Sequence, residues 1–191
     1  KLKDKVEFLK ILLEVSRYIL TLSKVNSSPQ PYNNGYIYLV NKKFSRLMFK
    51  SDKKCYSIGF PFRIITDEKG IISNFVLNGI ILLPIVITGA LQILNESDWN
   101  STEILDFAVP IEEWQKKQLK GVNQQHFCCD NFWLFIRDLM MYDVGYVRYD
   151  ISPEQFKPDN PTYHPVHHLH GGYCDDVSYR LGLNQAITID E

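Results

Sequence analysis

The sequence lacks the motifs that mark several common enzyme classes. Its 191 residues contain no P-loop, no glycine pattern of a dinucleotide-binding turn, no Cys-x-x-Cys pair and no His-Glu-x-x-His helix. Only four cysteines are present, and two of them, Cys128 and Cys129, are neighbours, which rarely suits a structural disulfide framework. We therefore expect a protein of the reducing cytoplasm, outside the P-loop, Rossmann and zincin classes.

The sequence also has almost no net charge, but this neutrality is the sum of two opposite regions. The formal charge is −1, whereas residues 1–63 carry thirteen Lys or Arg against four Asp or Glu, so the rest carries −10. The densest basic stretch, here called the basic stripe, comprises Lys42, Lys43, Arg46, Lys50, Lys53 and Lys54. The stripe would follow a nucleic-acid backbone, or protect a solvated strand edge, or form a surface matched to the acidic remainder of the molecule.

One stretch, residues 71–95, contains no charged residue and approaches the length that spans a bilayer. Asn78-Gly79, however, is a strong signal for a two-residue hairpin, and Pro84 interrupts the apolar run that follows. We therefore expect a buried β-hairpin that leads into a core helix, and no membrane insertion.

The remaining periodicity predicts an α+β fold in a single domain over residues 1–191. An amphipathic helix is expected at residues 3–24, and further helices at 86–94, at 110–121 and from an N-cap at Asp130. Alternating and β-branched segments predict an antiparallel sheet of about five or more strands packed against these helices. The expected strands are 35–41, 45–50, 55–66, 70–77, 80–85 and 145–152, with a further pair bent at Gly171-Gly172.

Four of the five histidines gather in "HPVHHLH", from His164 to His170. In an extended segment His168 and His170 share one face, while His167 points to the other. Upstream, "GYVRYDIS" alternates in the same way and places Arg148 and Asp150 on one face.

This combination suits cleavage of a phosphodiester without a metal ion. One imidazole would act as general base on a 2′-hydroxyl, and a second would act as general acid on the leaving oxygen. Arg148 would stabilise the negative charge of the transition state, and Asp150 would hold a histidine in the required tautomer. The structural alternative is an ordinary Arg148–Asp150 ion pair beside a polar loop whose imidazoles bind the backbone.

Zinc binding is the other chemical alternative for the histidines. His164, His168 and His170, with Cys174 or Asp175, could form a tetrahedral site, and His126 with Cys128 or Cys129 could contribute ligands from elsewhere. The absence of a Cys-x-x-Cys pair counts against this interpretation, and no other cofactor is expected.

The last quarter of the chain also resembles a known family. "VRYD" at 147–150, "HPVHHL" at 164–169 and the downstream Arg180 are similar to the bacterial proteins grouped as domain of unknown function 2290. The resemblance picks out Arg148, Asp150, His164 and His168, leaves His167 and His170 as local additions, and implies a terminal helix beyond Glu191.

A looser similarity of the Arg-Tyr-Asp and histidine motifs to TumE-type toxins implies ribonuclease activity. We therefore expect a cytoplasmic toxin or phage-defence component that acts on RNA or DNA, with an antitoxin or defence-system subunit as protein partner. In this hypothesis His170 assists the two family histidines. The alternative is a non-catalytic subunit in which the histidine loop is structural or binds zinc. Convergence of the named side chains around an open pocket would favour catalysis, and burial of each imidazole against the backbone would favour the alternative.

Overall fold

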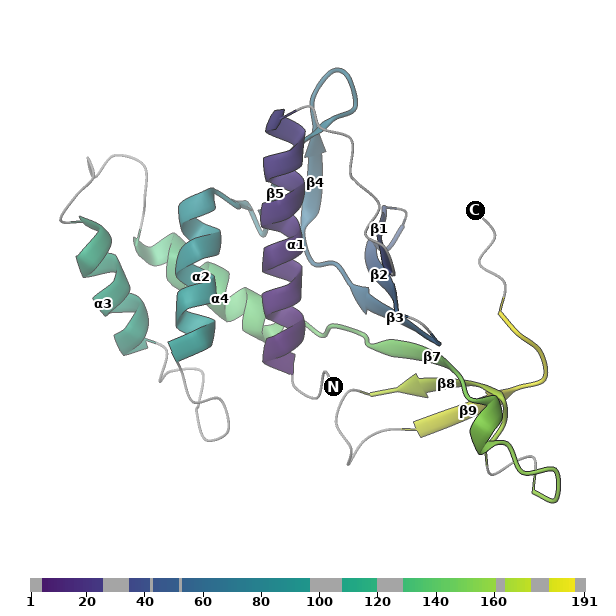
Figure 1. Cartoon of the computed structure of the whole chain (residues 1–191). Helices are drawn as coiled ribbons and strands as arrows, with labels where there is room; N and C mark the ends of the chain where they lie inside the picture. Colours follow the sequence, from purple (N-terminus) through teal and green to yellow (C-terminus); the bar gives the residue numbers. More distant parts are fainter. Residues whose placement is uncertain are drawn as a thin grey trace. The chain divides into compact units, whose positions relative to one another are not determined.

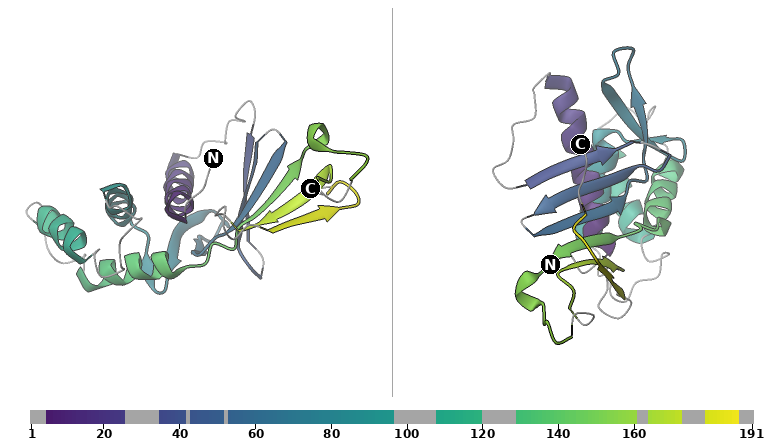
Figure 2. Two further views of the ribbon diagram at one scale, coloured as in Figure 1. Left: turned by 90° about the horizontal axis from the view of Figure 1, so that it is seen from below. Right: turned by 90° about the vertical axis from the view of Figure 1, so that its right-hand side faces the viewer.

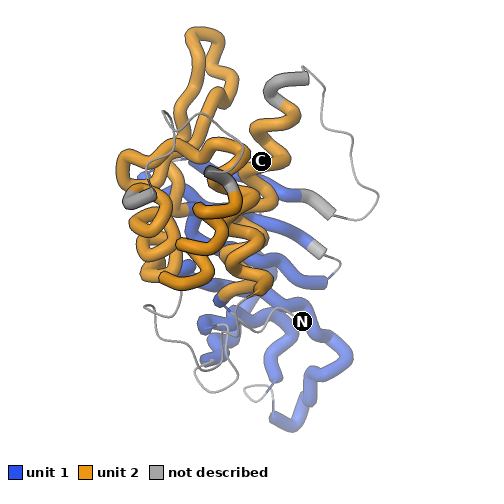
Figure 3. The backbone as a smooth tube through the Cα atoms, turned by 90° about the vertical axis from the view of Figure 1, so that its left-hand side faces the viewer, with its two compact units in different colours: residues 1–5, 30–60, 144–191 blue, residues 6–29, 61–143 orange. Residues whose placement is uncertain are grey.

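A computed structural model describes most of the chain, and the described part divides into two compact units (Figure 3). One unit comprises residues 1–5, 30–60 and 144–191, and the other comprises residues 6–29 and 61–143. The described residues are 5–25, 35–41, 43–51, 53–96, 108–119, 129–160, 164–172 and 179–187. The fold is α+β, as predicted, with four α-helices, a six-stranded antiparallel sheet and a three-stranded antiparallel sheet in the described part of the chain.

The second unit contains the helices and a small sheet (Figure 1). Its strands β4, β5 and β6 span Arg63–Thr66, Ile72–Leu77 and Ile80–Ile81. The predicted hairpin is present between β5 and β6, where Asn78 and Gly79 both have positive φ, 46° and 86°. The apolar run then continues into helix α2, Pro84–Glu96. None of the described helices is long and apolar enough to cross a membrane.

The other helices of this unit bury apolar faces. Helix α1, Lys5–Val25, packs an apolar stripe of the predicted spacing into the core. Helices α3, Ala108–Leu119, and α4, Cys129–Met141, contact each other where the rings of Trp114 and Phe132 stack at 4.4 Å. Gly89 of α2 lets the Trp114 ring approach, because a Cβ at residue 89 would lie within 2.3 Å of it. Helix α4 begins at Cys129, so Asp130 lies inside its first turn and the predicted N-cap position is wrong by one or two residues.

The first unit is built on a six-stranded antiparallel sheet in the order β1-β2-β3-β7-β8-β9 (Figure 2). The right-hand view shows β7, in green, continuing the sheet beside the blue strand β3, so segments far apart in the sequence form one layer. Arg46 links β3 to the start of β7, because its guanidinium donates to the backbone oxygens of Ser57 and Gly145. The strands span Gly35–Val40, Arg46–Ser51, Lys54–Gly59, Val147–Ile151, His167–Gly171 and Tyr179–Leu183.

One predicted strand, residues 55–66, is wrong in its extent. The chain leaves the large sheet after Gly59 and enters the small sheet at Arg63. Pro61 lies between the two strands and cannot donate to a ladder, so a single continuous strand is not formed. The N-terminal strands therefore belong to two sheets, and the larger one is completed by β7, β8 and β9.

Candidate functional site

The three C-terminal strands bring the predicted polar residues together on one face of the large sheet. Arg148 of β7 pairs with His170 of β8, and Asp150 pairs with His168. Paired residues of an antiparallel ladder point to the same side, so all four side chains share a face, as the alternation predicted. His170 in turn pairs with Arg180 of β9. His170 therefore lies in a cross-strand row between Arg148 and Arg180.

Arg148 and Asp150 form the ion pair at the centre of this face. The Arg148 Nε donates to Oδ1 of Asp150 at 2.7 Å and Nη2 donates to Oδ2 at 2.8 Å, which is a bidentate arrangement. The side chains are only 20% and 8% exposed. Because a buried carboxylate needs such a partner, the i, i+2 pair is a structural requirement of the site as well as a possible part of its chemistry.

His168 is the most deeply buried imidazole of the group, at 1% exposure. Its Nδ1 lies 3.0 Å from the backbone oxygen of Pro165, which can only accept, so Nδ1 carries the hydrogen. Burial, as the main cause, lowers the pKa of His168, and its Nε2 is left unprotonated and 3.8 Å from Oδ2 of Asp150. Gly182 makes room for this anchor, because a Cβ there would lie 2.8 Å from the Pro165 ring.

His170 is more accessible and is also held neutral. Burial, followed by the charge of Arg148, lowers its pKa from 6.5 to about 4, against the opposing effect of Asp150. Its Nε2 lies 3.4 Å from Oδ2 of Asp150, and its ring centroid lies 4.9 Å from that of His168. At neutral pH His170 is therefore a proton acceptor or a metal ligand, and not a general acid.

His164 lies at the exposed side of the cluster, beside Arg180. The Nη1 of Arg180 lies 3.0 Å from Nε2 and 3.2 Å from Nδ1 of His164. The ring centroids of His164 and His168 are 6.2 Å apart. Since a guanidinium can only donate, the contacted nitrogen of His164 is an acceptor in this arrangement.

Three of these residues lie close enough together to hold a metal ion. The ligand atoms of Asp150, His168 and His170 all lie within 4.8 Å of one another. Bonds of about 2.0–2.1 Å in a tetrahedral zinc site place ligand atoms roughly 3.3 Å apart, close to the 3.4 and 3.8 Å found between Oδ2 and the two Nε2 atoms. The Pro165 carbonyl on His168 is also the outer contact that metal-bound imidazoles usually have.

The cluster that could hold an ion differs in part from the predicted zinc ligands. It contains His168 and His170, as predicted, together with Asp150, which the register of β7 with β8 places opposite His168. His126, Cys128, Cys174 and Asp175 lie outside the described residues, and of Cys129 only the backbone is described.

The side chains of Arg148, Asp150, His168 and His170 converge on one face of the sheet, as catalysis would require. His168 is nevertheless buried and binds the backbone through one nitrogen only, while its other nitrogen faces Asp150. A hollow of about 350 Å³ is present in the sheet, but Tyr149 and Leu169, which line it, belong to the face opposite the cluster.

Three residues of the basic stripe already have partners within the protein. Arg46 donates to Ser57 and Gly145, Lys53 pairs with Glu154 at 3.2 Å, and Lys43 lies 5.6 Å from the centroid of the Phe44 ring. Lys50 and Lys54 are exposed, and Lys42 lies outside the described residues. The nucleic-acid contacts predicted for the stripe therefore remain a prediction. The guanidinium of Arg46 is already used in hydrogen bonds to Ser57 and Gly145.

Sequence reasoning did not place two contributors in the site. Arg180 was seen only as part of the family pattern, and its position beside His170 follows from the register of β8 with β9. The Pro165 carbonyl carries no sequence signal of its own. The bend predicted at Gly171-Gly172 does not give this register, because Gly171 is still part of β8 and pairs with Tyr179. Comparisons with family models, with curated proteins and with solved structures found no match for this chain.

Proposed function

We propose that the polar face of β7, β8 and β9 binds the phosphate groups of RNA and cleaves a phosphodiester bond. The observation that carries this proposal is the cross-strand row Arg148–His170–Arg180, which places a neutral imidazole between two permanent cations. Asp150 offsets one of the two positive charges, so the site keeps an excess of positive charge for an anion.

The bound phosphate would make His170 a better base. A negative charge near His170 opposes the effect of Arg148 and brings the pKa of His170 back from about 4 toward neutrality. His170 would then take the 2′-hydroxyl proton while the 2′-oxygen attacks phosphorus, giving a 2′,3′-cyclic phosphate. Arg148 and Arg180 would stabilise the charge on the non-bridging oxygens.

His164 is the residue we assign as general acid. A phosphate is a stronger acceptor for Arg180 than a neutral imidazole, so phosphate binding would release His164 from the 3.0 Å contact. The freed imidazole can take a proton from solvent and pass it to the leaving 5′-oxygen. His168, with Nδ1 bound to Pro165, would position Asp150 and His170 rather than contact the substrate.

This chemistry suits the biological role that the sequence resemblance implies. We accordingly propose a bacterial toxin or phage-defence protein of the cytoplasm, controlled by a protein partner. Expression of the chain should arrest bacterial growth, and the His170→Ala variant, produced in equal amount, should not. Equal arrest by both would remove the link between the site and toxicity.

The direct experiment is cleavage of end-labelled RNA, with a DNA of the same sequence alongside, in the presence of EDTA. His170→Ala should lose about a hundredfold in rate, the lower range for loss of a proton-transfer group. Arg180→Ala should lose about as much, because it removes a donor that stabilises the transition-state charge. The matched control is His167→Gln, on the same strand but on the opposite face, where it binds the Tyr149 hydroxyl. Products should end in a cyclic phosphate, and DNA should remain intact. Equal rates for all four proteins, or no cleavage of any RNA, would overturn the proposal.

The geometry of Asp150, His168 and His170 supports a second candidate, a zinc-dependent phosphodiesterase. In that case these residues would hold the ion, which would activate a water, and EDTA would abolish cleavage. Stoichiometric zinc binding that is lost in His168→Ala and in Asp150→Asn would favour this candidate. Cleavage of both RNA and DNA would also favour it, because an activated water does not need a 2′-hydroxyl.

A further inference from the structure

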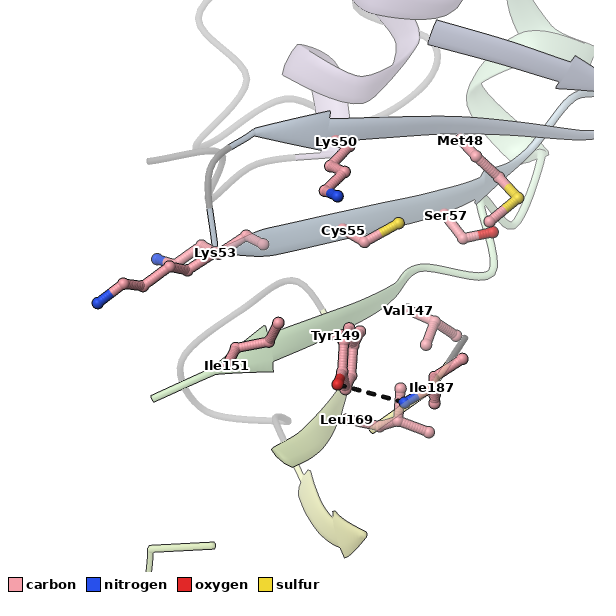
Figure 4. A pocket seen from close by; sticks show the side chains of 11 residues that line it. Met48, Lys50, Lys53, Cys55, Ser57, Val147, Tyr149, Ile151, Leu169 and Ile187 are labelled. Carbon is pink, nitrogen blue, oxygen red and sulfur yellow. Dashed lines mark hydrogen bonds between the residues drawn. The ribbon is translucent and has the colours of Figure 1, made fainter. Parts of the chain in front are cut away.

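The face of the large sheet opposite the polar cluster carries a hollow of about 350 Å³ (Figure 4). Its volume lies at the lower end of the range for small-molecule sites, about 300–1,000 Å³. Met48, Val147, Ile151 and Leu169 give it an apolar lining, and lysines lie at one end.

The strand register explains how this hollow is formed. Lys50, Cys55, Tyr149 and Leu169 follow one another across β2, β3, β7 and β8 as paired residues, so they lie in one row on the same face. Four strands about 4.8 Å apart make this row roughly 14 Å long. The row therefore runs from a cation at one end to an aliphatic side chain at the other.

Tyr149 lines the hollow with the face of its ring, because its hydroxyl is already hydrogen-bonded. The hydroxyl lies 2.8 Å from Nδ1 of His167 and accepts a hydrogen bond from the backbone N–H of Ile187 at 3.3 Å. Figure 4 shows the second of these bonds at the wall of the hollow. With its polar atom engaged, the side chain presents an aromatic surface to the interior of the hollow.

The lysines at the hollow differ in whether they already have an acidic partner. Lys53 is paired with Glu154. Lys54 also borders the hollow, but it pairs with Asp150 across β3 and β7 and therefore starts from the polar face. Within the part of the chain that the structure describes, Lys50 forms no ion pair, and it is exposed. Cys55 supplies no negative charge, because burial raises the pKa of its thiol despite the opposing charge of Lys50. The hollow thus has an apolar body and an uncompensated positive end.

We propose that this hollow binds a small amphipathic carboxylate, with its apolar chain on Met48, Val147 and Leu169 and its carboxylate at Lys50. This site is separate from the phosphodiester chemistry proposed for the other face and does not depend on it.

The test is calorimetric titration of the full chain with decanoate, decanol and decyltrimethylammonium. Decanoate should bind best and the cation worst, because the chain is the same and only the head group changes. Lys50→Glu should weaken decanoate binding about fivefold, which is the loss expected for one exposed charge contact. The matched control is Lys43→Glu, which removes a lysine of the basic stripe that does not line the hollow.

A second readout locates the ligand. At one fixed decanoate concentration, decanoate should slow alkylation of Cys55, measured by peptide mapping, more in the wild type than in Lys50→Glu. Equal binding of decanoate and decanol, equal effects of Lys50→Glu and Lys43→Glu, or no binding at all would overturn the proposal. Protection of Cys55 that rises with protein concentration without ligand would also overturn it, by assigning the hollow to a second copy of the chain.

Discussion

The two faces of the large sheet differ in how their polar groups are used, although the same strands build both. On one face Arg148, Asp150 and His168 bind one another or the backbone, and little of their surface is exposed. On the other face apolar side chains surround a hollow, and the charged groups beside it, Lys50 and the Lys53–Glu154 pair, are exposed. Strand β7, with the sequence VRYDI, supplies both faces through its alternation. Removing one member of a buried ion pair should therefore lower the free energy of unfolding more than removing one member of an exposed pair at the rim.

The largest effect should come from removing the carboxylate of the polar face. Asp150→Ala leaves the Arg148 guanidinium, 20% exposed, without its bidentate partner and should lower the free energy of unfolding by about 3 kcal/mol. Glu154→Ala removes the partner of Lys53 at the rim of the other face, where both side chains are more than half exposed, and should leave the free energy of unfolding almost unchanged. Urea denaturation measures both, and similar losses would contradict the contrast between the faces.

A smaller effect is expected from acid. Because the folded protein lowers the pKa of His170 from 6.5 to about 4, the unfolded chain binds the extra proton first as the pH falls. The contribution of His170 is complete above about pH 6.5 and is lost between about pH 6.5 and 4, which amounts to roughly 2 kcal/mol by pH 5. The groups that face His170 and set this shift are Arg148, Asp150, His168 and Arg180.

His170→Gln tests this linkage, because it removes the titrating group and keeps a polar side chain. Its stability should fall less than that of the wild type between about pH 7 and pH 5, when both are measured in urea. His167→Gln, on the opposite face, should keep the full pH dependence attributed to His170. If the wild type and His170→Gln lose stability in parallel, the lowered pKa is not the cause.

The smallest effect compares two glycines, one on each face of the same strand pair. A Cβ at Gly182 would meet the Pro165 ring at 2.8 Å and disturb the carbonyl that holds His168, so Gly182→Ala should cost about 1 kcal/mol. A Cβ at Gly171 would meet the Tyr179 ring, which is exposed and can turn away, so Gly171→Ala should cost little. Thermal denaturation compares the two variants, and NMR of the His168 Nδ1–H reports the anchor directly. An unchanged Nδ1–H signal in Gly182→Ala would show that Pro165 does not need this glycine.

Much of the local structure was predictable because it depends on short-range patterns. The hairpin at Asn78-Gly79 follows from the need for positive φ at both positions, and helix α1 follows from its apolar spacing. The shared face of Arg148 and Asp150, and of His168 and His170, follows from the period of two in a strand. Which strands become neighbours was not predictable, because pairing between β3 and β7 joins segments almost ninety residues apart.

The sequence by itself determined which side chains share a face of each strand, because the geometry of one strand fixes that alternation. Only the tertiary structure decided that β7, β8 and β9 lie side by side, and therefore that Arg180 stands beside His170 and that Asp150 faces two imidazoles. It also decided the burial that lowers the pKa of both histidines. The physical reason is that register and desolvation arise from contacts between distant segments, and no local pattern in a chain encodes the distance between them.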